Sequence, residues 1–71
     1  MTMGKQSARV LAYIQKHGTI TSMDAFRDLG ITRLSARIWD LRQAGVPVTD
    51  SYAYKIENGK VVTKWKVYRI A

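Results

Sequence analysis

The sequence predicts an α+β domain in which three short helices are followed by a β-hairpin. Two stretches indicate this class. Residues 21–45 (TSMDAFRDLGITRLSARIWDLRQAG) place apolar residues at helical spacing on both sides of a glycine. Residues 51–70 are rich in β-branched and aromatic residues and are divided by Asn58-Gly59, a strong hairpin signal. The chain has 71 residues, so we expect one domain, spanning residues 6–70.

The composition excludes several classes of protein. With 46% hydrophobic residues the chain is too apolar for a disordered basic tail. It has no cysteine, so neither a disulfide framework nor a zinc finger is available. No apolar run is long enough for a membrane span, and the N-terminus lacks a signal-peptide cleavage site. We therefore expect a soluble, intracellular protein.

The charge indicates the kind of partner. Twelve lysines and arginines against five acidic residues give a net charge of +7 and a pI near 10.2. Such a basic domain is a candidate for binding a polyanion, most often nucleic acid. The alternative is that the positive charge serves only solubility.

The first helix is expected over residues 7–16, with Ser7 as N-cap and Gly18 ending it. The β-branched residues 19–21 then form a short extended piece. Because such a piece is too short to stand alone, we expect it to pair with a strand around residues 67–70.

The second helix is expected over residues 23–29. Thr21 or Ser22 would cap it, and Asp24 completes a near capping box with Thr21. Met23 and Phe26 are expected to face inward, with Ala25 and Leu29 less firmly placed. Gly30 suits the sharp exit and Ile31 is expected to tuck back into the core.

The third helix is expected over residues 32–44, capped by Thr32 and ending at Gly45. Leu34, Ile38 and Leu41 form one core-facing stripe. The opposite side carries Arg33, Ala36, Asp40 and Gln43, with Ser35 and Trp39 on one flank and Arg37 on the other. We expect Trp39 to pack against the first helix or the hairpin, the alternative being a functional interface.

The hairpin register follows from a two-residue turn at Asn58-Gly59. One face would then hold the pairs Ile56–Val61, Tyr54–Thr63 and Tyr52–Trp65, and the other Lys55–Val62, Ala53–Lys64 and Ser51–Lys66. The apolar face is expected to pack on the helices or cover their edge. A bulge near residues 65–68 would change the register there, because Tyr68 and Ile70 also require burial.

This order of elements is that of a winged helix-turn-helix: a three-helix bundle plus a small antiparallel sheet with a C-terminal hairpin wing. The spacing G-x-I-T-x-x-x-A-x-x-x-L-G-I-x-x-L-x-x-R-I-x-x-L-R-x-x-G-x-x-V resembles the small winged helix-turn-helix domains often encoded in bacteriophages and prophages. It falls on Gly18, Ile20, Thr21, Ala25, Leu29, Gly30, Ile31, Leu34, Arg37, Ile38, Leu41, Arg42, Gly45 and Val48. The resemblance implies binding of double-stranded DNA in the cytoplasm of a bacterial host, with the third helix in the major groove.

The candidate base-contacting residues lie in the N-terminal half of the third helix. They are Thr32, Arg33, Ser35, Ala36 and Arg37. Arg33 can bind guanine through two hydrogen bonds, Ser35 can contact a base or phosphate, and an exposed Ala36 can touch a thymine methyl. The alternatives are that Thr32 is only a cap and that both arginines form a solvated face. Arg37 can also brace the fold through Asp24, Asp28 or Asp40.

The candidate phosphate contacts lie on the wing, namely Lys55, Lys60, Lys64 and Lys66. Lysines also protect edge strands from aggregation, and the two roles are compatible. Phosphate contacts position a protein but carry no base information.

Neither a catalytic constellation nor metal-ligand spacing is found around the single histidine, His17. We therefore expect no enzyme activity, no cofactor and no metal. The leading hypothesis is a DNA-binding regulator of transcription or recombination accessory factor, acting alone, as a homodimer or as a cooperative array. The alternative is a protein-interaction module that binds an acidic partner. If the hairpin aromatics are exposed, they could also stack on single-stranded bases.

Overall fold

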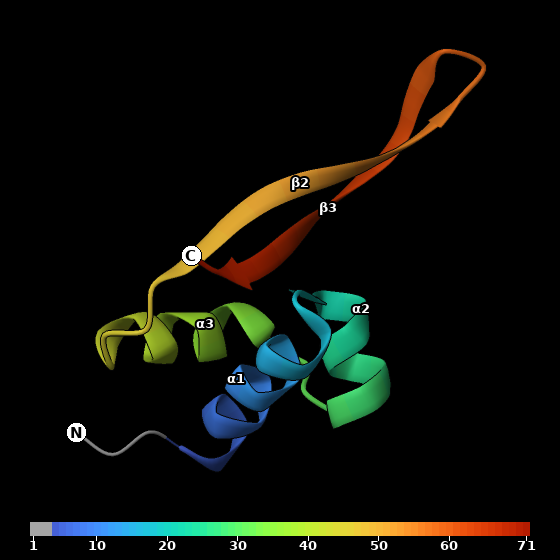
Figure 1. Ribbon diagram of the computed structural model, residues 1–71. Coiled ribbons are helices and arrows are strands. Elements are labelled where there is room, and N and C mark those ends of the chain that lie inside the picture. The colour runs from blue at the N-terminus through green and yellow to red at the C-terminus, as the bar shows by residue number, and fades with distance from the viewer. Residues whose placement is uncertain (1–3) are drawn as a thin grey trace.

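The computed structural model describes residues 4–71 as a helical body with a long β-ribbon extending from it (Figure 1). The molecule measures 48 × 24 × 20 Å, and the ribbon forms the long axis in Figure 1. The elements are α1 (Lys5–His17), β1 (Ile20–Thr21), α2 (Ser22–Asp24), η1 (Ala25–Leu29), α3 (Leu34–Gln43), β2 (Val48–Glu57) and β3 (Lys60–Ile70). The strands form one antiparallel sheet in the order β1-β3-β2. The predicted α+β winged helix-turn-helix class is confirmed.

One hydrophobic core joins the helices to the base of the sheet. The stripe predicted on the third helix is confirmed, because Leu34, Ile38 and Leu41 are all buried. Around them lie Val10 and Ile14 of α1, Ile20, Ala25, Ile31, Val48 and Tyr68. The predicted pairing of the short extended piece is also confirmed, since Ile20 pairs with Tyr68 and Thr21 with Val67. This pairing fixes the ribbon to the helical body.

The first helix begins earlier than predicted. Gly4 occupies the N-cap position, so Ser7 lies inside α1 and the prediction that it caps the helix is wrong. Ser7 is completely buried, and its hydroxyl donates a hydrogen bond to Asp40 Oδ2 at 3.1 Å. A hydroxyl that is buried between two helices needs a hydrogen-bond acceptor, because leaving it unpaired away from water costs free energy. The predicted stop is confirmed, because Gly18 has φ +92° and its N–H donates to Ile14 O.

The second helix is capped as predicted but faces the core differently. Thr21 Oγ1 accepts from the Asp24 N–H, and Asp24 Oδ2 accepts from the Thr21 N–H, completing the capping box. The helix continues as a turn of π-helix, η1, which ends at Gly30 with φ +68°. Met23 and Phe26 are 67% and 62% exposed, so the prediction that they face inward is wrong. The small Ala25 is buried instead, as is Ile31 beyond the turn.

The third helix begins at Leu34, two residues later than predicted. Arg33, not Thr32, occupies the N-cap position, and no side chain caps the helix. The helix is shorter than the predicted range 32–44, because it ends at Gln43 and Ala44 is its C-cap. Thr32 and Arg33 therefore lie in the turn that leads into α3 rather than on its surface.

The hairpin turn is confirmed, but the register beyond it differs from the prediction. Asn58 and Gly59 both have positive φ, and Glu57 pairs with Lys60 and Ile56 with Val61. Val62 is then an extra residue, so that Lys55 pairs with Thr63. The further pairs are Tyr54–Lys64, Ala53–Trp65, Tyr52–Lys66, Ser51–Val67, Asp50–Tyr68, Thr49–Arg69 and Val48–Ile70.

This bulge allows the core to form. Without it, Val48 would pair with Arg69 and would lie on the opposite face from Tyr68, because side chains alternate along a strand. With it, Val48, Tyr68 and Ile70 share one face. Val48 and Tyr68 are buried in the core, and Ile70 packs against it. The sequence offered a bulge near residues 65–68 as one possibility, but the bulge that is present lies beside the turn, at Val62.

Candidate nucleic-acid interface

The negative charges of the protein are paired, and much of the positive charge is not. Each of the five acidic side chains contacts at least one lysine or arginine: Arg27 with Asp24 and Asp28, Arg37 with Asp40, Arg42 and Lys66 with Asp50, and Lys55 with Glu57. The other seven basic residues have no ion pair within residues 4–71. They are Lys5, Arg9, Lys16, Arg33, Lys60, Lys64 and Arg69.

The exposed face of α3 agrees only in part with the one that the sequence indicated, because Arg33 and Gln43 are exposed but Ala36 and Asp40 are half-buried. Ser35, Trp39 and Arg42 are exposed and lie at i, i+4 and i+7, which places them along one stripe. Trp39 is 61% exposed, so the prediction that it packs against a neighbouring element is wrong. Ala36 is half-buried rather than exposed, which corrects its expected place on the outer surface. The same spacing was visible in the sequence, but the hydrophobicity of tryptophan suggested burial.

Arg33 and Thr32 lie exposed at the N-terminal end of α3. No side chain caps this end, so its backbone N–H groups remain available to solvent or to an anion. Arg33 has no acidic partner among the described residues. This end of the helix therefore combines an unpaired guanidinium, a hydroxyl and the positive end of the helix dipole.

Arg37 is held against the protein. Its Nε lies 3.3 Å from Asp40 Oδ2, and its Nη1 donates to Gln6 Oε1 at 3.3 Å. Asp40 also accepts the hydrogen bond from Ser7 on α1. Arg37 thus links α3 to α1 in the bracing role considered for it, through Asp40 rather than through Asp24 or Asp28.

The four wing lysines differ in their surroundings. Lys55 Nζ lies 3.3 Å from Glu57 Oε1, and Lys66 Nζ lies 3.3 Å from Asp50 Oδ2, which raises the pKa of Lys66. Lys60 and Lys64 have no acidic partner within residues 4–71. Lys64 Nζ lies 5.0 Å from the centre of the Tyr52 ring and Lys66 Nζ 5.7 Å, within range of a cation–π attraction.

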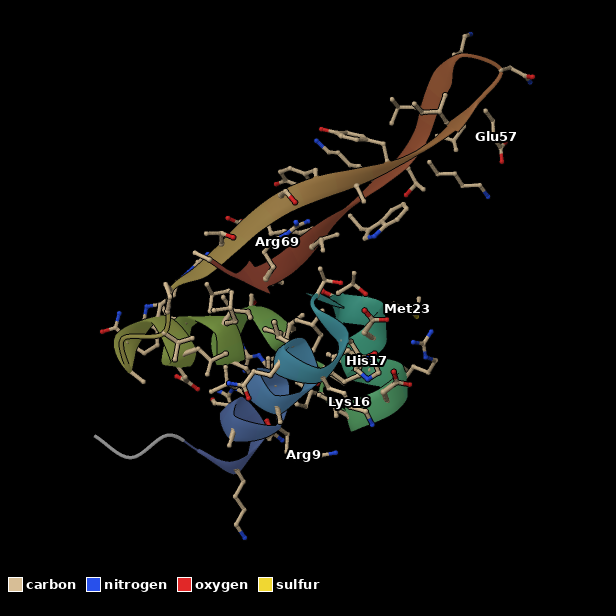
Figure 2. The ribbon with its side chains drawn as sticks, in the orientation of Figure 1. Arg9, Lys16, His17, Met23, Glu57 and Arg69 are labelled. Atoms are coloured by element: carbon tan, nitrogen blue, oxygen red, sulfur yellow. The ribbon has the colours of Figure 1, made fainter. Side chains whose placement is uncertain are left out.

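The observed register mixes aromatic and basic residues on one face of the ribbon. Tyr52 pairs with Lys66 and Tyr54 with Lys64, whereas Trp65 pairs with Ala53 on the other face. The prediction of one apolar face covering the helices and one lysine face is therefore wrong. Tyr52, Tyr54, Ile56, Val61, Val62 and Trp65 are all exposed. Glu57 marks the far end of this ribbon in Figure 2, well away from the helices.

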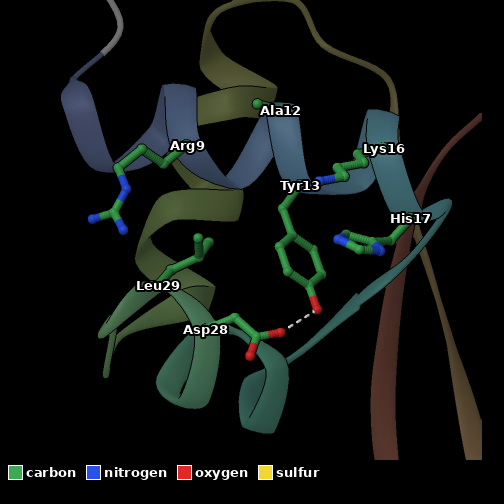
Figure 3. A pocket seen from close by; sticks show the side chains of 7 residues that line it. All are labelled: Arg9, Ala12, Tyr13, Lys16, His17, Asp28 and Leu29. Carbon is green, nitrogen blue, oxygen red and sulfur yellow. Dashed lines mark hydrogen bonds between the residues drawn. The ribbon is translucent and has the colours of Figure 1, made fainter.

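A separate hollow lies between α1 and η1 (Figure 3). It has a volume of about 390 Å³ and is lined by Arg9, Ala12, Tyr13, Lys16, His17, Asp28 and Leu29. The Tyr13 hydroxyl donates to Asp28 Oδ2 at 2.6 Å, and Arg27 Nε lies 2.9 Å from Asp28 Oδ1. The hydrogen bonds from Arg27 and Tyr13 lower the pKa of Asp28 to about 2. These contacts connect the first two helices and pair Tyr13 and Asp28, whereas Arg9 and Lys16, which also line the hollow, have no ion pair within residues 4–71.

Among the described residues, no group of three or more His, Cys, Asp or Glu side chains is placed to hold a metal ion. No helix within residues 4–71 has the length and hydropathy needed to cross a membrane.

Comparison with known proteins agrees with this fold. Residues 5–70 match the family model described as a winged helix-turn-helix domain, and the chain belongs to that family. No curated protein and no solved structure matches the chain. Membership indicates DNA binding, since helix-turn-helix domains typically bind DNA and are not enzymes.

Proposed function

We propose that this protein binds double-stranded DNA at specific sequences as a transcriptional regulator or recombination accessory factor of a phage or mobile element. The observation that carries the proposal is the unpaired, exposed Arg33 at the uncapped N-terminus of α3 in a winged helix-turn-helix. The site would be cytoplasmic DNA of a bacterial host. The domain would act by occupying its DNA site, alone, as a homodimer or in a cooperative array.

In this proposal α3 enters the major groove by its N-terminal end. Arg33 reads guanine, Thr32 and Ser35 contact bases or phosphate, and the free N–H groups of the helix end attract a phosphate. The exposed stripe brings Trp39 to the same groove, where its ring would pack on sugars or a thymine methyl. Ala36 borders this surface, whereas Arg37 acts mainly by bracing α3 against α1.

The wing supplies contacts to phosphate. Lys60 and Lys64 have no competing acidic partner among the described residues and are the stronger candidates. Lys55 and Lys66 must exchange Glu57 and Asp50 for phosphate, which weakens their net contribution. Tyr52 helps to hold Lys64 and Lys66 along one face of the ribbon.

The test is enrichment of duplexes from a random pool by the wild type and by Arg33→Ala. We expect the wild type to enrich one motif and Arg33→Ala to lose about 1–3 kcal/mol of discrimination at a guanine. Arg69→Ala, which removes an equally unpaired arginine from the sheet, is the matched control and should enrich the wild-type motif. Enrichment of the unchanged motif by Arg33→Ala would contradict the assignment of Arg33, as would loss of the motif in the control alone.

A second candidate function has its own supporting observation. Trp39, Tyr52, Tyr54 and Trp65 are exposed, as a module that docks an acidic protein or stacks single-stranded bases would require. Adding unlabelled single strands as competitors to the enrichment experiment distinguishes duplex binding, base stacking and binding of a protein partner. Binding that single strands displace more effectively than duplexes favours stacking, and the absence of any nucleic-acid binding favours a protein partner.

A further inference from the structure

The end of the ribbon carries an exposed apolar cluster that phosphate contacts alone do not explain. The cluster consists of Ile56, Val61 and Val62, whose side chains are 63%, 57% and 52% exposed. Ile56 and Val61 are paired across the ribbon next to the Asn58-Gly59 turn, and Val62 is the extra residue of the bulge. A hairpin that needed only to place lysines near phosphate would bear polar residues here.

The surroundings of this apolar tip indicate what it meets. Within residues 51–66 there are four lysines and one glutamate, a net charge of +3. Lys60 and Lys64 lie on either side of Val61 and Val62 in the sequence and have no acidic partner among the described residues. A second copy docking by the same surface would bring +3 against +3, which opposes association. A polyanion with an apolar interior, such as stacked base pairs, complements both features.

We infer that the apolar tip inserts into the minor groove as a wedge, partly unstacks one base step and bends the duplex. This inference rests on the proposed DNA-binding function. Apolar side chains between base steps are a general means of bending DNA, with kinks on the order of 20–90° toward the major groove. Lys60 and Lys64 would hold the flanking phosphates while the tip enters.

The dimensions of the ribbon are consistent with this inference. The ten residues of β2 span about 33 Å at the rise of a β-strand, and β1 pairs with β3 only near the helical body. The ribbon carries the tip away from the helical body (Figure 1). In the proposed complex the tip would reach a groove beside the one that α3 would occupy. The minor groove is only about 6 Å wide, so two strands about 4.8 Å apart with their side chains enter only if it opens.

The test measures binding and bending in the same samples. A duplex of about 30 base pairs carrying the enriched motif, or an A·T-rich one if no motif is enriched, bears a fluorophore at each end. Anisotropy reports binding, and energy transfer between the ends reports bending. 2-Aminopurine placed at successive steps reports unstacking. The proteins are wild type, Ile56→Ser/Val61→Ser, and the control Phe26→Ser, which changes an equally exposed apolar residue on η1.

We expect wild type and Phe26→Ser to raise energy transfer and brighten 2-aminopurine at one step. Ile56→Ser/Val61→Ser should remain bound, with an affinity within about tenfold of wild type, and leave the duplex straight. Both substituted residues are exposed, so the fold should persist, and circular dichroism checks this.

Binding of wild type without bending, or equal bending by Ile56→Ser/Val61→Ser, would overturn the inference while leaving the proposed function intact. Conversion of a wild-type dimer into monomers by the double substitution would also overturn it, in favour of a second copy as the occupant of the tip. Absence of DNA binding by all three proteins would instead refute the proposed function.

Discussion

Asp40 links α3 to α1 through its carboxylate. It accepts a hydrogen bond from the buried Ser7 and pairs with Arg37, so it holds α1 against the helix that carries the candidate base contacts. Ser7 is completely buried, and its hydroxyl depends on Asp40 as an acceptor. The position of α3 therefore depends on a contact between side chains of the protein itself.

We expect Asp40→Ala to lower the free energy of unfolding by about 1–3 kcal/mol, because it leaves a buried hydroxyl donor unsatisfied. In a Ser7→Ala background, Asp40→Ala should lower the free energy of unfolding by less, because the Ser7 hydroxyl donor is already absent. Urea denaturation of the two single variants and the double variant measures the difference. Glu57→Ala, which removes the exposed pair with Lys55, is the control and should change stability by less than about 1 kcal/mol. Equal costs of Asp40→Ala in both backgrounds would refute the coupling.

The residues that sequence reasoning placed wrongly share a physical cause. Met23, Phe26 and Trp39 were assigned inward because they are large and apolar, yet all three are exposed. In the second helix the small Ala25 occupies the buried position, and a larger side chain there would hold the helices apart. Hydrophobicity predicts burial only on average, and exposed apolar residues are common at binding surfaces.

The ribbon is the element with the least support from the rest of the fold. β1 pairs with β3 only at Val67 and Tyr68, so beyond Tyr52 each strand has only its partner strand. Two-stranded hairpins are marginally stable in water. The outer ribbon is nevertheless where the proposed phosphate contacts and the apolar tip lie.

We predict that backbone amides of residues 54–63 exchange with solvent much faster than those of Val10–Ile14 in α1, because opening the outer ribbon breaks no core contact. Hydrogen exchange followed by NMR measures this. Amides of Val67 and Tyr68, at the sheet base, serve as the internal comparison and should resemble the helix. Equal protection along the whole of β3 would contradict this account of the ribbon.

The ends of helices and the hairpin turn were predictable where a few neighbouring residues determine them. The capping box at Thr21, the glycine stop at Gly18 and the turn at Asn58-Gly59 were each predicted from a few neighbouring residues. The register of the hairpin was not, because the turn and the core require different alignments and only a bulge reconciles them. The expected burial of Tyr68 and Ile70 suggested a possible bulge near residues 65–68, whereas the extra residue is Val62, beside the turn.

The positive net charge of the molecule lies on basic side chains that have no acidic partner within residues 4–71. All five acidic side chains contact basic ones, and the net charge of +7 therefore corresponds to seven cations without ion pairs in residues 4–71. Three of these, Arg33, Lys60 and Lys64, belong to the proposed interface. Cations without a competing carboxylate can bind phosphate without first breaking an ion pair, so they should dominate the electrostatic part of DNA binding.

The most direct measurement of DNA binding is therefore the dissociation constant of a short duplex over a series of salt concentrations. We predict a strongly salt-dependent affinity, with each neutralised phosphate contributing about −0.9 to the slope of log K against log salt. Lys60→Ala/Lys64→Ala should make the slope shallower by about 1.8, as expected for two lost phosphate contacts. Lys5→Ala/Lys16→Ala, which removes two unpaired lysines from α1, should leave the slope unchanged. An affinity that is the same at low and physiological salt, or no binding at low salt, would contradict the account.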